Sequence, residues 1–457
     1  MKNAIHRYLA AVLAVCALCA GCGSSADTGS AFNGMIPEAS ASDKAGGTAV
    51  PSGGGGGSGE ATASDASAGD ASAFGADDAA AGTDAAVGEQ PAAGTLTAGD
   101  WNDNLNFSWF VSYLADMAQA NPGWATLPLQ TRVLVHVVTA QEGPVGNAHI
   151  RLLEDGAEVS ATFAGTDGRG VVLAQSAAAK RVVEVQVGAA APTAVDLPQG
   201  QTSLTVVTPE AAAPIDGMDV AFIVDTTGSM GDELDFLKVE VEALASNVKA
   251  ATGGADLRFG LVLYRDMGDE YVSRTFDFTT DITAFKANIG AQEAAGGGDT
   301  PEAVQEGFKV AGALSWRTGN VARVAIHVAD ASPHDQDFVA YYAALEALHK
   351  LGVRVFPVAS SGHDDGCEYV MRAAAALTVG RYVFLTDDSG VGVAQGHAKP
   401  HIPCFDVELL LGKLVRLLTS ELQGSYIPAD PKAIISSSGG PVAGVCTLDD
   451  GSQTYIY

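Results

Sequence analysis

The chain of 457 residues has few basic side chains, few aromatic side chains and few cysteines. Its 25 lysines and arginines stand against 54 aspartates and glutamates, which gives a formal net charge of -29. Nucleic-acid backbones and anionic membrane surfaces attract basic proteins, so this balance excludes both as main partners. Cations and basic protein surfaces fit better. The length is sufficient for two or three domains.

Apolar runs long enough to span a membrane are also missing. The chain begins MKNAIHRYLAAVLAVCALCAGCGSS, in which Lys2 and Arg7 precede an apolar run of about a dozen residues. A transmembrane helix needs about 20 apolar residues, so this run predicts a secretory signal peptide over residues 1–21. The ending LCAGC resembles a bacterial lipoprotein cleavage box, and that resemblance implies that Cys22 carries a lipid anchor.

The lipoprotein resemblance implies a location at the bacterial cell envelope. The N-terminal lipid would be the sole contact with the membrane, and plain secretion is the alternative. Gly23 and Ser24 follow Cys22, so the acid that retains such proteins at the inner membrane is missing and the outer membrane is preferred.

Few cysteines remain for disulfides. Cys16 and Cys19 leave with the signal peptide, which leaves Cys367, Cys404 and Cys446 in an exported and therefore disulfide-permissive chain. Three cysteines cannot all pair internally. The spacing leaves the pairing open, with a bridge that involves Cys404 favoured, and no pair has zinc-finger spacing.

Two composition changes divide the first part of the chain. Residues 22–99 consist mainly of Gly, Ala, Ser and Asp, a composition that cannot bury enough apolar area to offset the entropy of ordering. They predict a flexible, negatively charged tether. Residues 100–129 are rich in aromatics, some at helical spacing, and predict a helical segment that packs on a neighbouring domain.

Residues 130–210 predict a β-sandwich. Runs such as RVLVHVVT and SLTVVT alternate or are apolar, and Gly, Pro and Asp turns separate them. The stretch with Pro144, Ala148 and then TDGRG resembles the carboxypeptidase regulatory-like β-sandwich family. That resemblance implies a fold and says little about function.

Residues 217–422 change to strands that alternate with helices. MDVAFIV, RFGLVLY, VARVAIHVA, GVRVFPVA and RYVFL are short apolar runs typical of a parallel sheet that is buried on both faces. This alternation predicts a doubly wound, mostly parallel α/β domain with helices on both faces, of which 405–422 is the last helix. The tail, residues 423–457, has no predicted structure beyond a short β-like ending.

The stretch VAFIVDTTGSM places oxygen-bearing side chains directly after the first strand of this domain. Asp225, Thr227 and Ser229 are two residues apart, so their side chains can converge on one point. One carboxylate and two hydroxyls suit a small divalent ion and do not suit zinc or copper. Ligands of such sheets bind at the carboxyl ends of the strands, where this stretch lies.

Further oxygen-bearing side chains occur at the ends of later elements and in the first turn after DTTGSM. They are Asp232, Glu233, Asp266, Asp299, Thr300, Glu302 and Asp330.

Residues 217–422 resemble a von Willebrand factor type A domain, in the version found in integrin β subunits. DTTGSM matches the metal-ion-dependent adhesion motif Asp-x-Ser/Thr-x-Ser of that family, and GGGDTPEA and VADASPH follow in the family's order. The resemblance implies that one Mg²⁺ or Mn²⁺ ion is held by the motif and these later loops. The implied ligands are Asp225, Thr227, Ser229, Asp299, Thr300, Glu302 and Asp330. Adjacent sites, to which Ca²⁺ is suited, are implied for Asp232, Glu233 and Asp266.

One departure leaves the second loop open. Gly298 stands where simpler members of the family have a coordinating threonine, so the spacing does not decide whether Asp299, Thr300 or Glu302 replaces it.

The expected function is binding without catalysis. The resemblance implies that a glutamate or aspartate of a partner protein completes the metal shell, as in adhesion. One alternative is a structural Ca²⁺ site in a scaffolding or enzyme-accessory domain. Another is an aspartyl-phosphate hydrolase with Asp225 as nucleophile, against which Thr226 stands where that class has lysine. The sequence does not indicate the partner or the oligomeric state.

Overall fold

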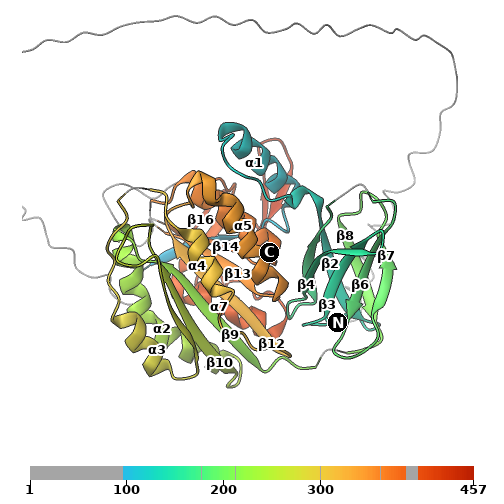
Figure 1. The fold of residues 1–457 in the computed structure, drawn as a ribbon, viewed down its shortest axis with the longest axis horizontal. Coiled ribbons are helices and arrows are strands. Elements are labelled where there is room, and N and C mark those ends of the chain that lie inside the picture. Colours follow the sequence, from blue (N-terminus) through green and yellow to red (C-terminus); the bar gives the residue numbers. More distant parts are fainter. Residues whose placement is uncertain (1–95, 176–177, 212, 299, 361, 387–399) are drawn as a thin grey trace, which may run out of the picture. The chain divides into compact units, whose positions relative to one another are not determined.

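The computed structural model describes residues 96–175, 178–211, 213–298, 300–360, 362–386 and 400–457. They belong to one compact unit, Thr83–Tyr457. The predicted signal peptide, Cys22 and nearly all of the predicted tether lie outside the described residues. A large sheet with helices and a smaller β-sandwich make up the described chain (Figure 1).

The large sheet has nine strands in the order β11-β10-β9-β12-β13-β14-β1-β15-β16. Its five parallel strands are β9 (Gly217–Asp225), β10 (Asp256–Tyr264), β12 (Val321–Ala329), β13 (Arg354–Ala359) and β14 (Tyr382–Thr386). Strands in antiparallel pairings extend the sheet on both sides: β11 (Ser273–Thr279) pairs with β10 on one side, and β1 (Thr97–Trp101), β15 (Phe405–Leu409) and β16 (Ser436–Ser438) follow β14 on the other. Every residue of β9 and β12 is buried, as a sheet covered on both faces requires.

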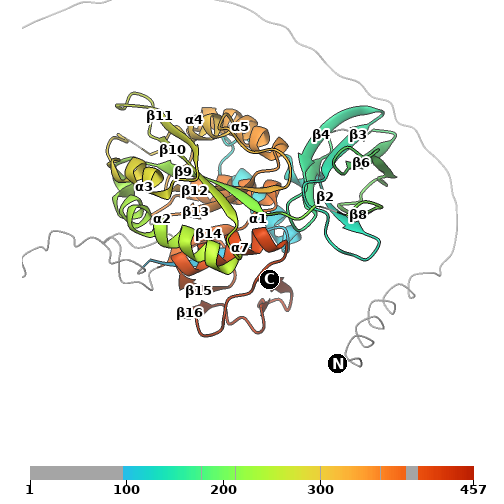
Figure 2. The same ribbon diagram turned by 90° about the horizontal axis from the view of Figure 1, so that it is seen from below.

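Helices cover both faces of the sheet. One face carries α2 (Gly231–Ala251), α3 (Ile282–Gly290) and α7 (Leu410–Gln423). The other carries α1 (Phe107–Ala120), α4 (Val304–Ala311), α5 (Phe338–Lys350) and α6 (Asp365–Thr378). Short 3₁₀ turns are η2 (Leu129–Thr131), η3 (Gly228–Met230) and η4 (Asp335–Asp337). Figure 2 shows the layers, and the predicted doubly wound fold is confirmed.

The β-sandwich consists of a three-stranded and a four-stranded sheet around an apolar core. The first sheet contains β2 (Arg132–Thr139), β5 (Arg169–Leu173) and β8 (Ser203–Thr208), and the second contains β3 (His149–Glu154), β4 (Ala157–Phe163), β6 (Arg181–Gln186) and β7 (Thr193–Asp196). The likeness of this part to the carboxypeptidase regulatory-like family stays a prediction.

The first described strand differs from the predicted boundary at residue 99. Residues 97–99 belong to β1, which lies inside the large sheet between β14 and β15. Asp100 in β1 is buried and forms ion pairs with Arg381, Lys413 and Arg416, all from the C-terminal third of the chain. Local composition could not predict this strand, because its partners are more than 280 residues away in sequence.

The last predicted helix is wrong over its first five residues. Residues 405–409 form β15, which pairs with β1, and α7 begins at Leu410. The alternating stretch FDVEL suits a strand once β1 offers an edge to pair with.

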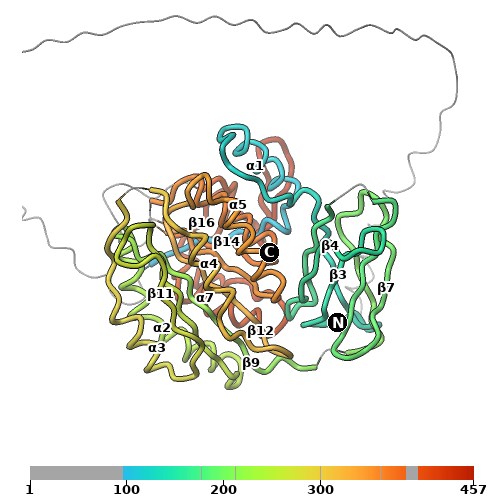
Figure 3. The backbone as a smooth tube through the Cα atoms, viewed as in Figure 1, coloured from blue at the N-terminus to red at the C-terminus, as the bar shows by residue number. Residues whose placement is uncertain are grey.

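The C-terminal tail is tied back to the main domain. It contains β17 (Val445–Thr447) and β18 (Gln453–Tyr455), which form a small hairpin. The Cys404–Cys446 disulfide links the hairpin to the segment before β15, and Cys367 is a buried free thiol. The side-chain amide of Asn106, at the start of α1, exchanges two hydrogen bonds of 2.8 Å with the backbone of Tyr455. The tube in Figure 3 shows α1 beside this red C-terminal segment.

Candidate metal centre

The predicted motif lies where β9 ends at the carboxyl edge of the sheet. Asp225 is fully buried as the last residue of that strand. Its Oδ1 accepts hydrogen bonds from the backbone N–H of Thr227 at 2.9 Å and from the Thr227 hydroxyl at 2.7 Å. Its Oδ2 is buried and has no hydrogen-bond partner. The carboxylate is therefore fixed in orientation by one oxygen while the other oxygen is unsatisfied.

A glycine loop from the chain before α4 closes over the motif. The Gly228 N–H donates to the carbonyl of Gly296 at 3.1 Å, so the two loops pair. Gly297 has φ +69°, and a Cβ there would lie 2.7 Å from Glu302 Oε1 and 2.9 Å from Thr227 Cβ. Glycine is required at this position for both reasons, and Gly297 lies between the motif and Glu302.

Two acids from other loops join Asp225. The Glu302 N–H donates to the carbonyl of Ser332 at 2.9 Å, which holds Glu302 against the loop that follows β12. Asp330, at the end of β12, receives a side-chain hydrogen bond from Ser229. Three loops that are far apart in sequence thus meet at one edge of the sheet, as the sequence led us to expect.

The electrostatics show a surplus of negative charge in this cluster. Burial raises the pKa of Asp225 to about 7, with a contribution from the charge of Asp330. Burial and the neighbouring acids, Asp225 first, raise the pKa of Glu302 to about 9. Burial also raises the pKa of Asp330. In the described part of the chain, no lysine or arginine forms an ion pair with any of the three.

The donor set fits a hard divalent ion. Asp225 Oδ2 and Glu302 Oε2 are both buried without a partner, and every candidate donor is an oxygen. The described residues contain no group of three or more His, Cys, Asp and Glu side chains arranged to hold a metal by themselves. The hydroxyls of Thr227 and Ser229, together with water, would therefore have to complete the shell, which suits Mg²⁺ because that ion keeps waters.

The acids predicted for adjacent sites are placed differently from one another. Asp232 is exposed in the first turn of α2, whereas Glu233 is buried and its charge contributes to the raised pKa of Asp225. Asp266 Oδ1 lies 2.9 Å from Nε2 of His334. These three acids lie near the candidate metal centre, but the structure does not bring them together as the ligands of a second metal site.

Solvent exposure distinguishes the candidate oxygen donors of the second loop. Thr300 is exposed and Glu302 is buried with its carboxylate at Gly297, which favours Glu302 as the loop's oxygen donor. Asp299 lies outside the described residues.

Two acids near the centre were not among the predicted site residues. Asp269 Oδ2 accepts from the backbone N–H of Gly297 at 3.0 Å, and its charge raises the pKa of Glu302. Asp364 caps α6, accepts from the Ser332 hydroxyl at 3.3 Å and raises the pKa of Asp330. Each lies in a loop after a strand that ends at this edge of the sheet. That position in the sequence could have identified both acids as candidates for the site.

Comparison with known proteins identifies this part of the chain as a domain of a known class. A family described as the von Willebrand factor A domain matches residues 219–390, so the chain contains such a domain. Alpha-protein kinase vwkA of Dictyostelium discoideum is 34% identical over 123 residues, which are 26% of this chain and 19% of that protein. The chain thus spans about a fifth of the length of that relative.

The solved structures that match part of the chain have low sequence identity and low TM-scores. The pilus adhesin SpaC of Lactobacillus rhamnosus GG is 13% identical with a TM-score of 0.31, over 44% of this chain and 29% of that one. The conserved hypothetical protein BatB of Bacteroides thetaiotaomicron is 15% identical with a TM-score of 0.25, over 47% and 91% of the two chains.

No helix in the described part of the chain combines the length and the apolar character needed to span a bilayer.

Proposed function

We propose that the von Willebrand factor A domain is a metal-dependent protein-binding module. Asp225, Thr227 and Ser229 would hold one Mg²⁺ or Mn²⁺ ion, with Glu302 and Asp330 supplying negative charge behind it. The observation that carries the proposal is the buried, unpartnered Oδ2 of Asp225 among acids whose pKa values are raised. A divalent cation would offset that surplus charge and satisfy the free oxygen.

The side of the site that faces solvent is the motif loop. Gly228 and Ser229 are exposed, whereas Asp225 and Thr227 are buried. The buried residues would therefore hold a bound metal on its protein side. One coordination position on the solvent side, at Ser229, would stay open. In this proposal a glutamate or aspartate of a partner protein occupies that position, and the Thr227 hydroxyl keeps the Asp225 carboxylate in one orientation.

The module would be displayed on a bacterial envelope. The lipid at Cys22 and the predicted tether would connect it to the membrane, with the outer membrane preferred. Ca²⁺ at the adjacent acids Asp232, Glu233 and Asp266 belongs to the same proposal and has less support, because these acids do not converge.

We propose no catalytic role. A phosphoryl donor would have to reach an oxygen of Asp225, but this residue is fully buried and its Oδ1 is occupied by Thr227. A structural Ca²⁺ site is a weaker alternative because the exposed rim at Ser229 leaves the ion open to a partner. The kinase relative gives no support for phosphotransfer here, since it matches only 26% of this chain. Trapping of phosphate on Asp225 during incubation with a phosphate ester would contradict this view.

Metal titration tests the proposal. After removal of metal by EDTA, calorimetric titration with Mg²⁺ and with Mn²⁺ should show binding that Asp225→Ala weakens by at least about tenfold. Asp256→Ala is the matched control, because Asp256 is an exposed aspartate at the other end of the same sheet. Equal metal affinity of the two variants would show that Asp225 is not a ligand. A partner captured from surface extracts should be released by chelator and should not bind Asp225→Ala.

A further inference from the structure

The buried carboxylate of Asp100 contacts a lysine that also contacts a second carboxylate. Asp100 Oδ1 lies 2.5 Å from Nζ of Lys413 in α7, and the same Nζ lies 3.0 Å from Oε1 of Glu408 in β15. At most 6% of any of these three side chains is exposed. We call Asp100, Lys413 and Glu408 the β1–α7 triad. It combines an amine, a carboxyl group and a proton acceptor in a place from which bulk water is excluded.

The strand pairing and the last helix build the β1–α7 triad. In the antiparallel pair of β1 and β15, Ala98 lies opposite Glu408. Asp100 lies two residues after Ala98 and therefore points to the same face of the sheet, as a diagonal neighbour of Glu408. α7 packs on this face, because Ala98 belongs to the same apolar cluster as Leu410 and Leu414 of that helix. The sheet and α7 thus enclose the triad.

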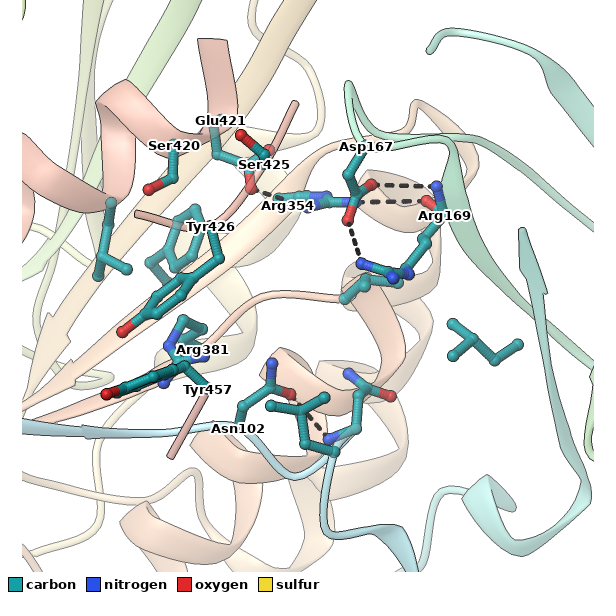
Figure 4. Close-up of a pocket in the computed structure, with 16 residues that line it drawn as sticks. Asn102, Asp167, Arg169, Arg354, Arg381, Ser420, Glu421, Ser425, Tyr426 and Tyr457 are labelled. Atoms are coloured by element: carbon teal, nitrogen blue, oxygen red, sulfur yellow. Dashed lines mark hydrogen bonds and ion pairs between the residues drawn. The ribbon is translucent and has the colours of Figure 1, made fainter. Parts of the chain in front are cut away.

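An arginine holds the other oxygen of Asp100. Nε of Arg381 donates to Asp100 Oδ2 at 2.5 Å, and its Nη2 donates to the carbonyl of Ile456 at 2.6 Å. The Arg381 guanidinium carbon lies 4.3 Å from the centroid of the Tyr426 ring, and Figure 4 shows these two side chains together. Arg381 is therefore fixed in place with its charge at Oδ2, while Oδ1 faces Lys413.

The ionised cluster carries a large amount of buried charge. Three cations, Lys413, Arg381 and Arg416, face the carboxylates of Asp100 and Glu408. Burial raises the pKa of Asp100, but the three cations outweigh burial and lower this pKa well below its usual range, so Asp100 begins as a carboxylate. The cost of taking an ion pair out of water can exceed the attraction within the pair. A neutral bond between Lys413 and Asp100 would remove that cost.

We propose that Lys413 and Asp100 join in an intramolecular amide bond. Lys413 first passes a proton to Asp100 Oδ1, which places a neutral amine in contact with a carboxylic acid. The Nζ lone pair then forms a bond to Cγ of Asp100, and Arg381 stabilises the negative charge that develops on Oδ2. Glu408 carries a second proton from Nζ to Oδ1. The Cγ–Oδ1 bond breaks with its electron pair, and Oδ1 leaves as water.

This reaction is balanced without a co-reactant. Of the three protons on the Lys413 ammonium, two leave in the water and one stays on the amide nitrogen. A cation and an anion are replaced by a neutral amide, so the net charge is unchanged, and nothing is oxidised or reduced. Glu408 gives up the proton that it takes. The candidate metal centre contributes no residue to the β1–α7 triad.

The amide bond would strengthen the point at which the predicted tether enters the domain. β1 is five residues long and is the first described strand. A pull on the predicted lipid anchor would act on β1, which noncovalent contacts hold between β14 and β15. With the amide bond, β1 would be joined covalently to α7 and could not leave the sheet while α7 stays folded.

Mass spectrometry of the purified full chain, denatured and with its disulfide reduced, tests the bond. The chain should be lighter than the unlinked sequence by the mass of one water molecule. Proteolysis of the denatured chain should release one fragment in which the segments that contain Asp100 and Lys413 are joined. A chain with the full mass of the unlinked sequence would overturn the proposal and leave an ion pair only. This measurement on the unmodified chain is decisive even where a variant fails to fold.

Variants assign the roles within the β1–α7 triad. Lys413→Arg keeps the positive charge and should lose the bond completely. Glu408→Gln should slow formation of the bond by at least about a hundredfold, because its amide cannot carry the proton. Lys238→Arg is the matched control: the Lys238 side chain is 24% exposed and lies 2.9 Å from Asp235, and this variant should still lose one water. Thermal unfolding checks that each variant folds.

Three further results would count against the proposal. Loss of water that persists in Lys413→Arg would place the modification elsewhere in the chain. Bond formation at an unchanged rate in Glu408→Gln would exclude Glu408 as the proton carrier. A bond that forms only with divalent metal would assign the reaction to the metal centre. Bond formation in EDTA is expected, so the mass measurement and the metal titration test this proposal and the proposed function separately.

Discussion

Replacement of Asp225 by asparagine should stabilise the metal-free protein at alkaline pH. The expectation follows from the pKa of Asp225, which burial raises from 3.8 to about 7. A carboxyl group whose pKa is higher in the folded state disfavours folding at every pH at which it is ionised in the unfolded chain. Below about pH 4 the penalty is absent, and it grows as the pH rises until it is complete above about pH 7.

The magnitude can be worked from the two pKa values. A change from 3.8 to about 7 corresponds to about 4 kcal/mol of lost stability at pH 8. Asparagine removes that penalty and keeps an oxygen for the N–H and hydroxyl of Thr227. Its amide nitrogen would replace the unpartnered Oδ2, and an unpaired buried donor costs about 1–3 kcal/mol. Asp225→Asn should therefore be more stable by about 1–3 kcal/mol at pH 8 and less stable below about pH 4.

The assay is denaturation of both proteins in EDTA across pH 4 to 8. The stability difference should move in favour of Asp225→Asn by about 1.4 kcal/mol per pH unit between about pH 4 and pH 7. Saturating Mg²⁺ should reverse the order at pH 8, because a ligand of the folded state stabilises only the protein that binds it. A difference that stays flat with pH would refute the reasoning, and Asp256→Asn is the control for a general effect of charge removal.

Three other changes test the same structural reasoning. Gly297→Ala should lower Mg²⁺ affinity at least about tenfold, because its Cβ would meet Glu302 and Thr227; Gly253→Ala, with a similar φ of +71° and nothing within 4 Å, should leave affinity unchanged in the same titration. Arg372→Met should cost about 3–5 kcal/mol in urea denaturation, since it removes the cation that faces the buried carboxylates of Asp103 and Glu368, to which Trp101 and His401 supply hydrogen bonds. Cys404→Ser should cost about 4 kcal/mol, the value for opening a loop of 42 residues, as measured by the same denaturation under oxidising conditions.

Each of these expectations has a result that would contradict it. Equal Mg²⁺ affinity in the two glycine variants would place Gly297 outside the site. A loss below about 1 kcal/mol in Arg372→Met would mean that the buried acids find other partners or water. Reducing agent should lower the stability of the unmodified chain by as much as Cys404→Ser does. If neither the reducing agent nor the substitution lowers the free energy of unfolding, the disulfide does not stabilise the protein.

The sequence was sufficient for the parts of the site that depend on strand ends. Apolar runs predicted β9 and β12, and parallel strands must end at one edge, so Asp225 and Asp330 were expected to be close. The sequence could not choose among Asp299, Thr300 and Glu302, and Asp299 lies outside the described residues. That choice depends on how the glycine loop folds back on Thr227, which the backbone pairing of Gly228 with Gly296 fixes.

The strand β1 could not be predicted from the local amino-acid composition. Residues 97–99 look like the end of the tether, yet β1 completes a sheet whose other strands are formed by residues 217–438. What holds β1 there is a buried carboxylate, Asp100, and burial of a carboxylate is tolerated only with partners. Lys413 and Arg416 supply them from α7, and Arg381 does so from the start of β14.

That arrangement also explains why the β-sandwich and the α/β domain form one compact unit. The chain leaves the large sheet after β1, builds α1 and the sandwich, and returns to the sheet at β9. Arg354, at the start of β13, then pairs with Asp167 of the sandwich and with Glu421 of α7. A domain inserted between two strands of one sheet is held at both of its ends, and the ion pairs of Arg354 add a further attachment between the sandwich, the large sheet and α7.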